Sequence, residues 1–486
     1  MNPIISLLKI EPTETIQTQL INQFQQLIRT GILSSGQKLP SSRFLADELK
    51  IHRQTVVKVY EDLVLQGWLS SVAGKGTFIS DTLPEINPQA FSKQPKQRIK
   101  AGFEFSPKPF IVRPVVKSSS ALHLDDGFPD PRLAPLTELS RAYKTNISKG
   151  NLYQKLGYGD TKGVLALRSE LALYLNKTRG LNIGAENILI VRGTVMGFYL
   201  SNLAFVNPND NVAVGQMSWQ SGKIGFQQAG ANLIEIPTDE GGMCIDALEE
   251  VCKKMPLRMV YVTPHHDYPT TVIMKADRRL KLLDLAKKYR FIIFEDDYDY
   301  DFHYQSKPLL PLASADSEGL VLYSGSFTKS ISPAFRVGYL VGPTEAIDHL
   351  AFHRRIIDRQ GDNMLEMAVA DILKDGTLER FLRKSLKTYR ERRGVFSELL
   401  DTHLSDFVKY DLPEGGMSIW TKFDRKIDLV ATALLAFKNG LYISDGSQFD
   451  SPQLQPNATR LGFASSNESQ LEQSVEILKR SLVFKK

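Results

Sequence analysis

A single lysine stands among small hydroxyl residues in the stretch YSGSFTKSISPAFRVGY, residues 323–339. Lys329 follows Ser326 and Thr328, and Arg336 comes seven residues later. Apolar β-type runs flank the stretch on both sides, GLVLYSGS before it and RVGYLVG after it. A lysine amine can form a Schiff base with an aldehyde, and hydroxyl and guanidinium groups can bind a phosphate. The stretch could therefore hold a phosphorylated aldehyde, or it could be an exposed turn with incidental charges.

Further polar residues follow strand-like runs elsewhere in the chain. FIIFEDDYDYDF places Asp296 and Tyr298 at the end of an apolar strand, and NVAVGQMSWQSGK ends another shortly before Trp219. In NILIVRGTVMG a third strand ends and a helix is expected to begin at Thr194. Because ligands of open α/β sheets bind beyond the carboxyl ends of the strands, we expect these residues to lie near Lys329. Taken singly, each run would more often be a solvated loop.

Together these residues meet the needs of pyridoxal 5'-phosphate (PLP), a cofactor that takes a Schiff-base lysine, an acid beside its ring nitrogen and an anion site. Lys329 supplies the first, and Asp296 would keep the ring nitrogen protonated, which makes the ring an electron sink. Tyr298 can hydrogen-bond the ring hydroxyl, and Trp219 offers a flat face for stacking. The phosphate would be held by hydroxyl, guanidinium and helix-terminal N–H groups at Ser326, Arg336 and Thr194.

Size and composition predict a soluble protein of two or three domains. The chain has 486 residues, 42% of them hydrophobic and 23% charged, which is ordinary for globular proteins. Its two cysteines, Cys244 and Cys252, form no disulfide framework and have no metal-binding spacing. No apolar run approaches the ~20 residues of a membrane span, so we expect a cytoplasmic protein with no membrane partner and no metal site.

The first 80 residues are predicted to form a winged helix-turn-helix. The segments TIQTQLINQFQQLIRTGIL, LPSSRFLADELK and RQTVVKVYEDLVLQG have apolar residues at helical spacing. Two β-type runs, WLSSV and GTFIS, follow around Gly74 as a hairpin. The formal net charge of +6 comes entirely from residues 1–120, which favours an anionic partner at this end.

Double-stranded DNA is the partner that this arrangement favours. The second helix of a helix-turn-helix lies in the major groove with its first residues near base edges, and a wing can reach phosphate or the minor groove. The candidate DNA contacts are Arg43, His52, Arg53, Gln54, Thr55, Lys58 and Lys75. Any one of them alone could be a solvated side chain.

The rest of the chain changes character twice. Residues 81–120 are basic, contain Pro and Ser, and show no sustained period, as expected for a linker. From about residue 121, short apolar strands alternate with helical segments, which indicates a mainly parallel sheet covered on both faces. From about residue 376, long charged helices predict a smaller C-terminal subdomain.

Several motifs resemble a known family. LPSSRFLADELKIHRQTVVKVYEDLVLQGWL and GKGTF are similar to GntR-type winged helices, and GFPDPRLAP, LGYGDTKGVLALRSELALYL, EDDYDYDF, SFTKSISPAFRVGY and TRLGFA are similar to fold-type I aminotransferases. The combination resembles the MocR-type subfamily of GntR transcriptional regulators. The resemblance implies an α/β chain in which a winged helix-turn-helix (1–80) and a linker (81–120) precede a PLP-dependent transferase-like effector and dimerisation domain (121–486).

The resemblance also implies roles for individual residues. It assigns the Schiff base to Lys329, the ring nitrogen to Asp296, the ring hydroxyl to Tyr298 and the phosphate to Ser326 and Arg336. Two further positions complete the implied site. Tyr158 would reach the phosphate of a neighbouring subunit, which implies a homodimer, and Arg460 would bind the α-carboxylate of an amino-acid ligand with its guanidinium fork. A surface arginine is the alternative for Arg460.

Three positions depart from the family pattern. Where aminotransferases have Asn-Pro-Thr-Gly, this chain has Tyr268 at the first position and Thr271 at the last. Two residues after the stacking aromatic, regulators that respond to γ-aminobutyrate carry an arginine, and here the residue is Ser221. We therefore do not expect γ-aminobutyrate to be the effector.

The resemblance implies a PLP-dependent, DNA-binding regulator that senses an amino acid, an amine or PLP itself through aldimine chemistry at Lys329. An aminotransferase that carries an accessory DNA-binding domain is the alternative. A repressor whose second half only dimerises is a third hypothesis, and the presence of Lys329, Asp296 and Arg336 argues against it.

Overall fold

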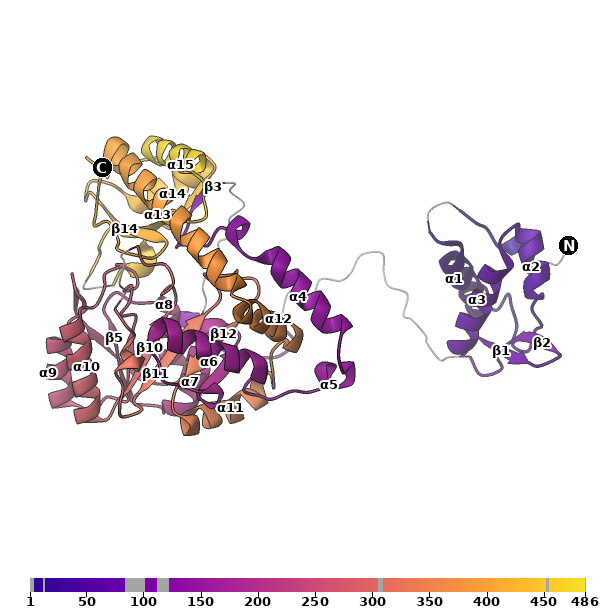
Figure 1. The fold of residues 1–486 in the computed structure, drawn as a ribbon. Helices are drawn as coiled ribbons and strands as arrows, with labels where there is room; N and C mark the ends of the chain where they lie inside the picture. Colours follow the sequence, from indigo (N-terminus) through magenta and orange to yellow (C-terminus); the bar gives the residue numbers. More distant parts are fainter. Residues whose placement is uncertain are drawn as a thin grey trace. The chain divides into compact units, whose positions relative to one another are not determined.

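The computed structural model describes residues 4–11, 14–83, 101–111, 122–304, 309–451 and 454–485. The chain divides into two compact units, Met1–Ser106 and Pro107–Lys486, each of which is drawn in Figure 1. The greater part of the linker predicted at 81–120 lies outside the described residues.

The first unit is a three-helix domain with a β-hairpin. Its elements are η1 (Ile5–Leu7), α1 (Ile16–Arg29), α2 (Ser42–Leu49), α3 (Arg53–Leu65), β1 (Leu69–Val72) and β2 (Gly76–Ile79). The side chains of Thr15 and Ser41 cap α1 and α2 by accepting backbone N–H groups of the first turn. Leu20, Phe24 and Val59 are buried between the helices. The structure thus confirms the predicted order of a winged helix-turn-helix.

The second unit is built on a twisted central sheet. In the described part of the chain this sheet has seven strands. In spatial order they are β4 (Ile188–Val191), β12 (Gly338–Val341), β11 (Val321–Ser326), β10 (Ile292–Asp297), β9 (Met259–Val262), β5 (Asn211–Gly215) and β6 (Asn232–Ile236). β12 is antiparallel to both of its neighbours, and the other pairs are parallel. The prediction of a mainly parallel sheet is therefore confirmed.

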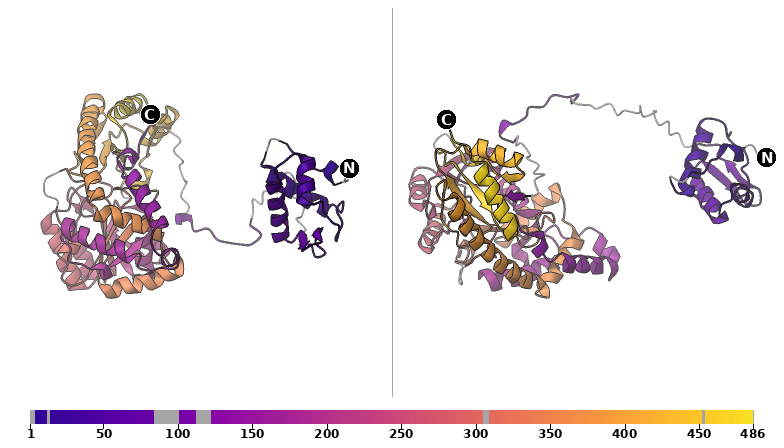
Figure 2. Two further views of the ribbon diagram at one scale, coloured as in Figure 1. Left: turned by 45° about the vertical axis from the view of Figure 1, so that its right-hand side comes forward. Right: turned by 90° about the horizontal axis from the view of Figure 1, so that it is seen from above.

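Helices cover both faces of this sheet (Figures 1 and 2). They are α6 (Leu165–Arg179), α7 (Gly193–Phe205), α8 (Gln220–Gln228), α9 (Ile245–Lys254), α10 (Ala276–Tyr289), α11 (Thr344–Ile357) and α12 (Asn363–Lys374), and α4 (Leu136–Ser148) and α5 (Leu152–Leu156) contact α12. Successive side chains of a strand point to opposite faces. Leu189 and Val191 accordingly pack with α7, α8 and α11, whereas Ile188 and Ile190 pack with α6 and α12. Such strands must be apolar throughout, as the sequence shows.

A C-terminal subdomain packs against the central sheet and its covering helices. Its elements are α13 (Thr377–Leu404), β13 (Val408–Tyr410), β14 (Ser418–Phe423), α14 (Leu429–Lys438), β15 (Leu441–Ile443), β16 (Ala458–Gly462) and α15 (Glu468–Arg480). Figure 2 shows the long helix α13 alongside α15. The remaining short elements are η2 (Pro109–Ile111), η3 (Pro131–Leu133), η4 (Ala185–Asn187), η5 (Leu312–Ser314), η6 (Ser447–Phe449), β7 (Thr238–Asp239) and β8 (Gly242–Met243).

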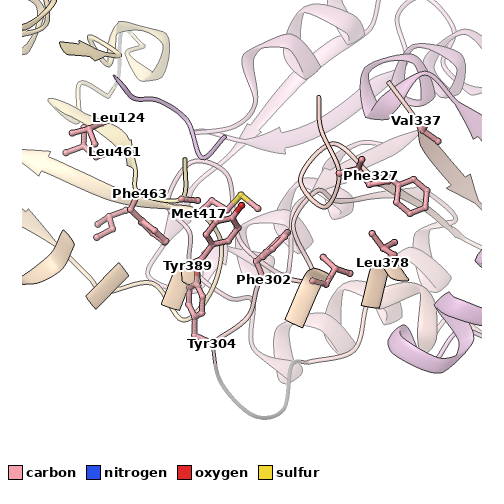
Figure 3. Close-up of a cluster of buried hydrophobic side chains, with 14 of the residues drawn as sticks. Leu124, Phe302, Tyr304, Phe327, Val337, Leu378, Tyr389, Met417, Leu461 and Phe463 are labelled. Atoms are coloured by element: carbon pink, nitrogen blue, oxygen red, sulfur yellow. The ribbon is translucent and has the colours of Figure 1, made fainter. Parts of the chain in front are cut away.

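One strand of this subdomain comes from far away in the sequence. β3 (Leu122–Leu124) pairs in parallel with β15, and Figure 3 shows Leu124 against Leu461 of β16. The predicted start of the subdomain near residue 376 did not include this strand, because three residues give too short a pattern to assign a partner. Near its beginning, the second unit is thus joined to its own C-terminal part.

The segment after β3 is also fixed to α13. The backbone N–H of Asp130 donates to the hydroxyl of Tyr389 at 2.9 Å, and Arg392 forms an ion pair with the Asp130 carboxylate at 2.9 Å. Tyr389 is buried beside Phe302 in the apolar cluster of Figure 3. A buried N–H group must be paired, so this contact holds the segment in place.

Replacing Tyr389 by Phe should lower the free energy of unfolding of the second unit by about 1–3 kcal/mol, because the buried N–H of Asp130 would lose its acceptor. Urea denaturation of the full chain would measure the change. Tyr289→Phe is the control, since that half-buried tyrosine ends α10 away from the cluster. Equal midpoints for the two variants would contradict the role of the Tyr389 hydroxyl.

Candidate functional site

Three consecutive carboxylates close β10, and the structure buries Glu295, Asp296 and Asp297 alike. Glu295 accepts two backbone N–H groups of η5 at 2.8 and 2.9 Å, and Asp297 accepts the hydroxyl of Tyr323 at 2.6 Å. Asp296 accepts the hydroxyl of Tyr261 through Oδ2 at 2.8 Å. Among the described residues, no group donates to its Oδ1. Glu295 is paired through both oxygens, whereas Asp296 and Asp297 each keep one buried oxygen without a donor among the described residues.

The environment of Asp296 suits a cationic N–H donor. Burial, together with the nearby charges of Asp297 and Asp299, raises the pKa of this carboxyl group to about 7, although the Tyr261 hydrogen bond acts to lower it. A protonated pyridine nitrogen would give Oδ1 the donor that it lacks and would favour the ionised carboxylate. The residues present therefore fit the ring of PLP.

Lys329 lies in the loop that follows β11, the strand next to β10. Its Nζ donates to the carbonyl oxygen of Gly127 at 2.6 Å and lies 3.5 Å from the carbonyl oxygen of Asp126. The ring centre of Phe128 is 5.6 Å from the same nitrogen. Burial lowers the pKa of Lys329 below that of an ordinary lysine. Because of this lower pKa, a larger fraction of Lys329 is the neutral amine, which is the form that attacks an aldehyde.

Trp219 and Phe198 pack against Tyr261, the residue that donates to Asp296. Trp219 lies parallel to Tyr261, with ring centres 6.4 Å apart and an angle of 29°. Phe198 meets both rings edge-on at 5.9 and 5.5 Å. The half-buried Trp219 is therefore held rigidly beside the tyrosine that donates to Asp296.

The residues that are candidates for binding the phosphate lie around the start of α7. Arg336 donates to the carbonyl oxygen of Arg192 at 3.1 Å, and a Cβ on Gly193 would lie 2.7 Å from its Nη2. Gly193 has a φ of 73°, in the left-handed region that favours glycine. Ser326 pairs with Gly338, whose own Cβ would lie 2.7 Å from the Cα of Gly193. The structure thus brings Ser326, Arg336 and the helix terminus with Thr194 to one place, a favourable anion site.

Arg460 is buried on β16, with 3% of its surface exposed, so it is not a surface arginine. It forms an ion pair with Asp126. Its Nη1 donates to the carbonyl oxygen of Pro269 at 3.2 Å and to the hydroxyl of Tyr298 at 3.4 Å. Tyr298 itself donates to the carbonyl oxygen of His266 at 2.9 Å. Tyr298 and Arg460 therefore belong to one cluster.

Two of the three departures from the family pattern, Tyr268 and Thr271, lie in a turn beside this cluster. Tyr268 donates to Asp126 at 2.7 Å, and the Arg460 guanidinium lies 4.8 Å from its ring centre. Thr271 has a φ of 65°, a conformation that costs a residue with a Cβ about 1–2 kcal/mol. Its backbone N–H donates to the carbonyl oxygen of Asp267 at 2.6 Å, which closes the turn. Ser221 is the second residue of α8 and is half-buried.

Tyr158 stands apart from the cluster around Lys329. It is 80% exposed, and the guanidinium of Arg359 lies 4.2 Å from its ring centre. A residue this exposed in a single chain is not among the side chains that enclose the site. Its predicted contact with the phosphate of a neighbouring subunit stays a prediction.

Sequence reasoning missed four residues of the site: Tyr261, His266, Asp126 and Gly127. Tyr261 could have been found, because a tyrosine inside an apolar strand needs a partner for its hydroxyl. His266 is fully buried and its Nδ1 lies 2.6 Å from Asp299, which no local pattern indicates. Asp126 and Gly127 contact Arg460 and Lys329 across more than 200 residues of sequence. Within the described ranges, no group of three or more His, Cys, Asp or Glu is arranged to hold a metal ion.

The first unit presents the predicted DNA contacts around the start of α3. Arg53, Gln54 and Lys58 are exposed, Thr55 is half-buried, and the ring of His52 caps the helix by accepting the N–H of Gln54 at 3.3 Å. Two more candidates lie outside this helix. Arg43 is exposed on α2, and Lys75 is exposed at the tip of the hairpin. In the described part of the chain, no helix has the length and apolar character needed to cross a membrane.

Comparison with known proteins finds two family matches. Residues 131–478 match the family described as aminotransferase class I and II, and residues 16–79 match the bacterial regulatory proteins of the gntR family. The chain is 30% identical to the HTH-type pyridoxine biosynthesis transcriptional regulator PdxR of Corynebacterium glutamicum, over 95% of this chain and 94% of PdxR. It is 26% identical to the probable rhizopine catabolism regulatory protein MocR of Rhizobium meliloti, over 96% of this chain and 93% of MocR.

A solved structure matches the second unit. The kynurenine aminotransferase of Pyrococcus horikoshii, crystallised in complex with PMP, is 29% identical and superposes with a TM-score of 0.69. The match covers 75% of this chain and 91% of the aminotransferase.

Asp296→Asn should flatten the pH dependence of stability of the cofactor-free chain. The pKa of Asp296 is raised to about 7 in the folded protein and is about 3.9 in an unfolded chain. Its stabilising effect is therefore complete below pH ~4 and is lost as the pH rises through ~7. Between pH 5 and 8, wild type should lose about 2–3 kcal/mol of unfolding free energy more than Asp296→Asn.

Urea denaturation at a series of pH values would measure this difference. Asp284→Asn, which removes an exposed carboxylate of α10, should keep the wild-type pH dependence. Parallel curves for wild type and Asp296→Asn would contradict the raised pKa.

Proposed function

Since this chain belongs to the MocR-type regulators, with a gntR-family domain before a class I and II aminotransferase domain, we propose that it is a PLP-dependent transcriptional regulator. It would bind operator DNA through the winged helix and sense an amino compound at Lys329. The observation that carries the cofactor assignment is the buried Asp296 Oδ1, which lacks a donor among the described residues. A gntR-family domain, together with relatives that match over the whole chain, favours regulation over an aminotransferase with an accessory domain.

Residues of the second unit would hold the cofactor at the carboxyl end of the sheet. When bound, PLP supplies an aldehyde that captures amines and a ring that withdraws electrons. Lys329 provides the amine, and Asp296 holds the proton of the ring nitrogen. Trp219 provides a stacking face, and Tyr298 lies within reach of Arg460. The phosphate would lie among Ser326, Arg336 and the N-terminus of α7 at Thr194.

Arg460 would select the ligand. A guanidinium binds a carboxylate with two parallel hydrogen bonds, and burial of Arg460 strengthens this attraction. An amino acid would thus be held at its amino end by the cofactor at Lys329 and at its carboxylate by Arg460. PLP itself is a second effector class, since the pyridoxine biosynthesis regulator PdxR is among the relatives.

Regulation requires that the ligand favours one arrangement of the chain over another. We assign residues 1–80 to DNA binding, 81–120 to a linker and 121–486 to sensing and dimerisation, with a subdomain from about 376. The exposed Tyr158 would complete the phosphate site of a second copy. A homodimer presents two winged helices, which suits a DNA site with two half-sites. Promoter DNA as the partner implies a cytoplasmic location.

Lys329→Ala should remove covalent cofactor binding. Wild-type protein mixed with PLP should turn yellow, and borohydride reduction should attach the cofactor to the peptide that contains Lys329. Absorbance and peptide mass would be measured, with Lys438→Ala, a change in the last turn of α14, as the control. A wild type that stays colourless in excess PLP would refute the proposal.

Arg53→Ala should weaken binding to the DNA upstream of the protein's own gene by about 1–3 kcal/mol, the usual contribution of an arginine to base recognition. Fluorescence anisotropy with this fragment and with a scrambled one would measure it. Lys9→Ala removes the same charge from an exposed position before α1 and should have little effect. An equal loss in both variants, or on both fragments, would show a general charge effect instead of base recognition.

A further inference from the structure

One short loop contacts both cations of the proposed ligand site. The loop comprises residues 125–128, between β3 and the turn η3. Its Gly127 carbonyl oxygen accepts Lys329 Nζ at 2.6 Å, and its Asp126 carboxylate pairs with Arg460. The amine that would carry the cofactor and the guanidinium that would bind the ligand are thus both engaged by the chain itself.

The ion pair of Asp126 satisfies an arginine that water barely reaches. Arg460 has 3% of its side chain exposed, whereas Asp126 has 36%. A buried guanidinium without a counter-charge is strongly destabilising, so Arg460 needs a carboxylate in the ligand-free protein. The second oxygen of Asp126 accepts the hydroxyl of Tyr268 at 2.7 Å, which orients the carboxylate toward the arginine.

We infer that Asp126 is an internal carboxylate that competes with the ligand's carboxylate for Arg460, and that it thereby determines which amino compounds bind. This inference rests on the proposed function, in which Arg460 receives the ligand. A ligand carboxylate that pairs with Arg460 must displace Asp126. A carboxylate with a third of its surface already in solvent can return to water at modest expense, while the arginine cannot.

The loop is built to move between fixed ends. On one side, β3 pairs with β15, and on the other, Asp130 is held by Tyr389 and Arg392 of α13. Gly127 lies between them with a φ of 68°, a conformation that glycine adopts without strain. Displacing Asp126 therefore requires a change in a few residues and leaves the apolar cluster of Figure 3 intact.

Covalent binding of the cofactor to Lys329 would affect the other contact of the loop, the hydrogen bond from Lys329 to the carbonyl oxygen of Gly127. A lysine nitrogen that is covalently linked to an aldehyde would keep at most one N–H in place of three, so its hydrogen bonding to the carbonyl oxygens of Asp126 and Gly127 would be weakened. Each of the two binding events would thus weaken or remove one contact of the same loop. The loop directly follows β3, and the residues before β3 lead along the chain to the DNA-binding unit. Its displacement is a route by which ligand binding can reach that unit.

The test compares wild-type chain and Asp126→Asn, both loaded with PLP. The probes are L-alanine and ethylamine, which differ by the carboxylate alone. Because the variant lacks the Asp126 carboxylate, its affinity for L-alanine should be about tenfold or more higher than that of wild type. Its affinity for ethylamine should stay within about twofold of wild type. Both affinities would be measured from the absorbance of the bound cofactor. Asp284→Asn, with the same charge change at an exposed site, should behave like wild type.

Two other results would overturn the inference. An unchanged affinity for L-alanine would mean that Asp126 is a permanent partner of Arg460. A loss of affinity for both probes would mean that Asp126 binds the ammonium group of the ligand. If Asp126→Asn does not fold, Asp126→Ser, which keeps an acceptor for Tyr268, replaces it.

A second measurement needs no cofactor. In cofactor-free protein, Asp126→Asn should melt at a lower temperature than wild type, because Arg460 loses its counter-charge. Acetate should restore the melting temperature of the variant and have a smaller effect on wild type and on the Asp126→Asn, Arg460→Met double variant. Equal acetate effects in all three would refute the competition. Failure of wild type to bind PLP would refute the proposed function alone, since the acetate test does not depend on it.

Discussion

A buried charge must find a partner, and this requirement organises the second unit. Three successive carboxylates end β10, where a solvated loop would have been the common outcome. Burial raises the pKa of Glu295 and of Asp296 to about 7 and that of Asp297 to about 6. The fold supplies donors for both oxygens of Glu295 and for one oxygen each of Asp296 and Asp297. Asp296 remains incompletely paired at the carboxyl end of the sheet, which is where such folds bind ligands. The cofactor proposal depends on this oxygen, because Asp296 lies at Tyr261 beside Trp219, whereas Asp297 has the buried guanidinium of Arg179 nearby.

The need of a buried charge for a partner also accounts for the contacts of Arg460 and Lys329. Arg336 lies against Gly193 at the start of α7, where a Cβ would collide with its guanidinium, and Gly338 at the start of β12 lets the backbone of Gly193 come close. Arg460 is enclosed by tyrosine rings and balanced by Asp126. Lys329 donates to the loop that contains Asp126, and burial lowers its pKa although the charge of Asp126 acts to raise it. In the described part of the chain, each of these cations contacts protein groups that a ligand would have to replace or share.

The loop at residues 125–128 connects Lys329 and Arg460 to the secondary structure of the second unit. It begins at β3, which comes from the start of the second unit and pairs with a strand of the C-terminal subdomain. It ends at Asp130, which is bound to α13. A ligand that changes this loop would therefore act on a segment that contacts Lys329 and Arg460 and is fixed at both ends to the C-terminal subdomain.

The sequence by itself determined the two-part organisation, the order of helices and hairpin in the first unit, and the mainly parallel sheet of the second. These follow from local periodicity and from turn residues, which act over a few positions. It also placed Lys329, Asp296 and Arg336 at strand or helix ends. Only the tertiary structure decided that β3 joins β15, that Tyr261 donates to Asp296 and that Asp126 pairs with Arg460. Those contacts join residues tens to hundreds of positions apart, and a local pattern does not encode which distant partner a buried charge will meet.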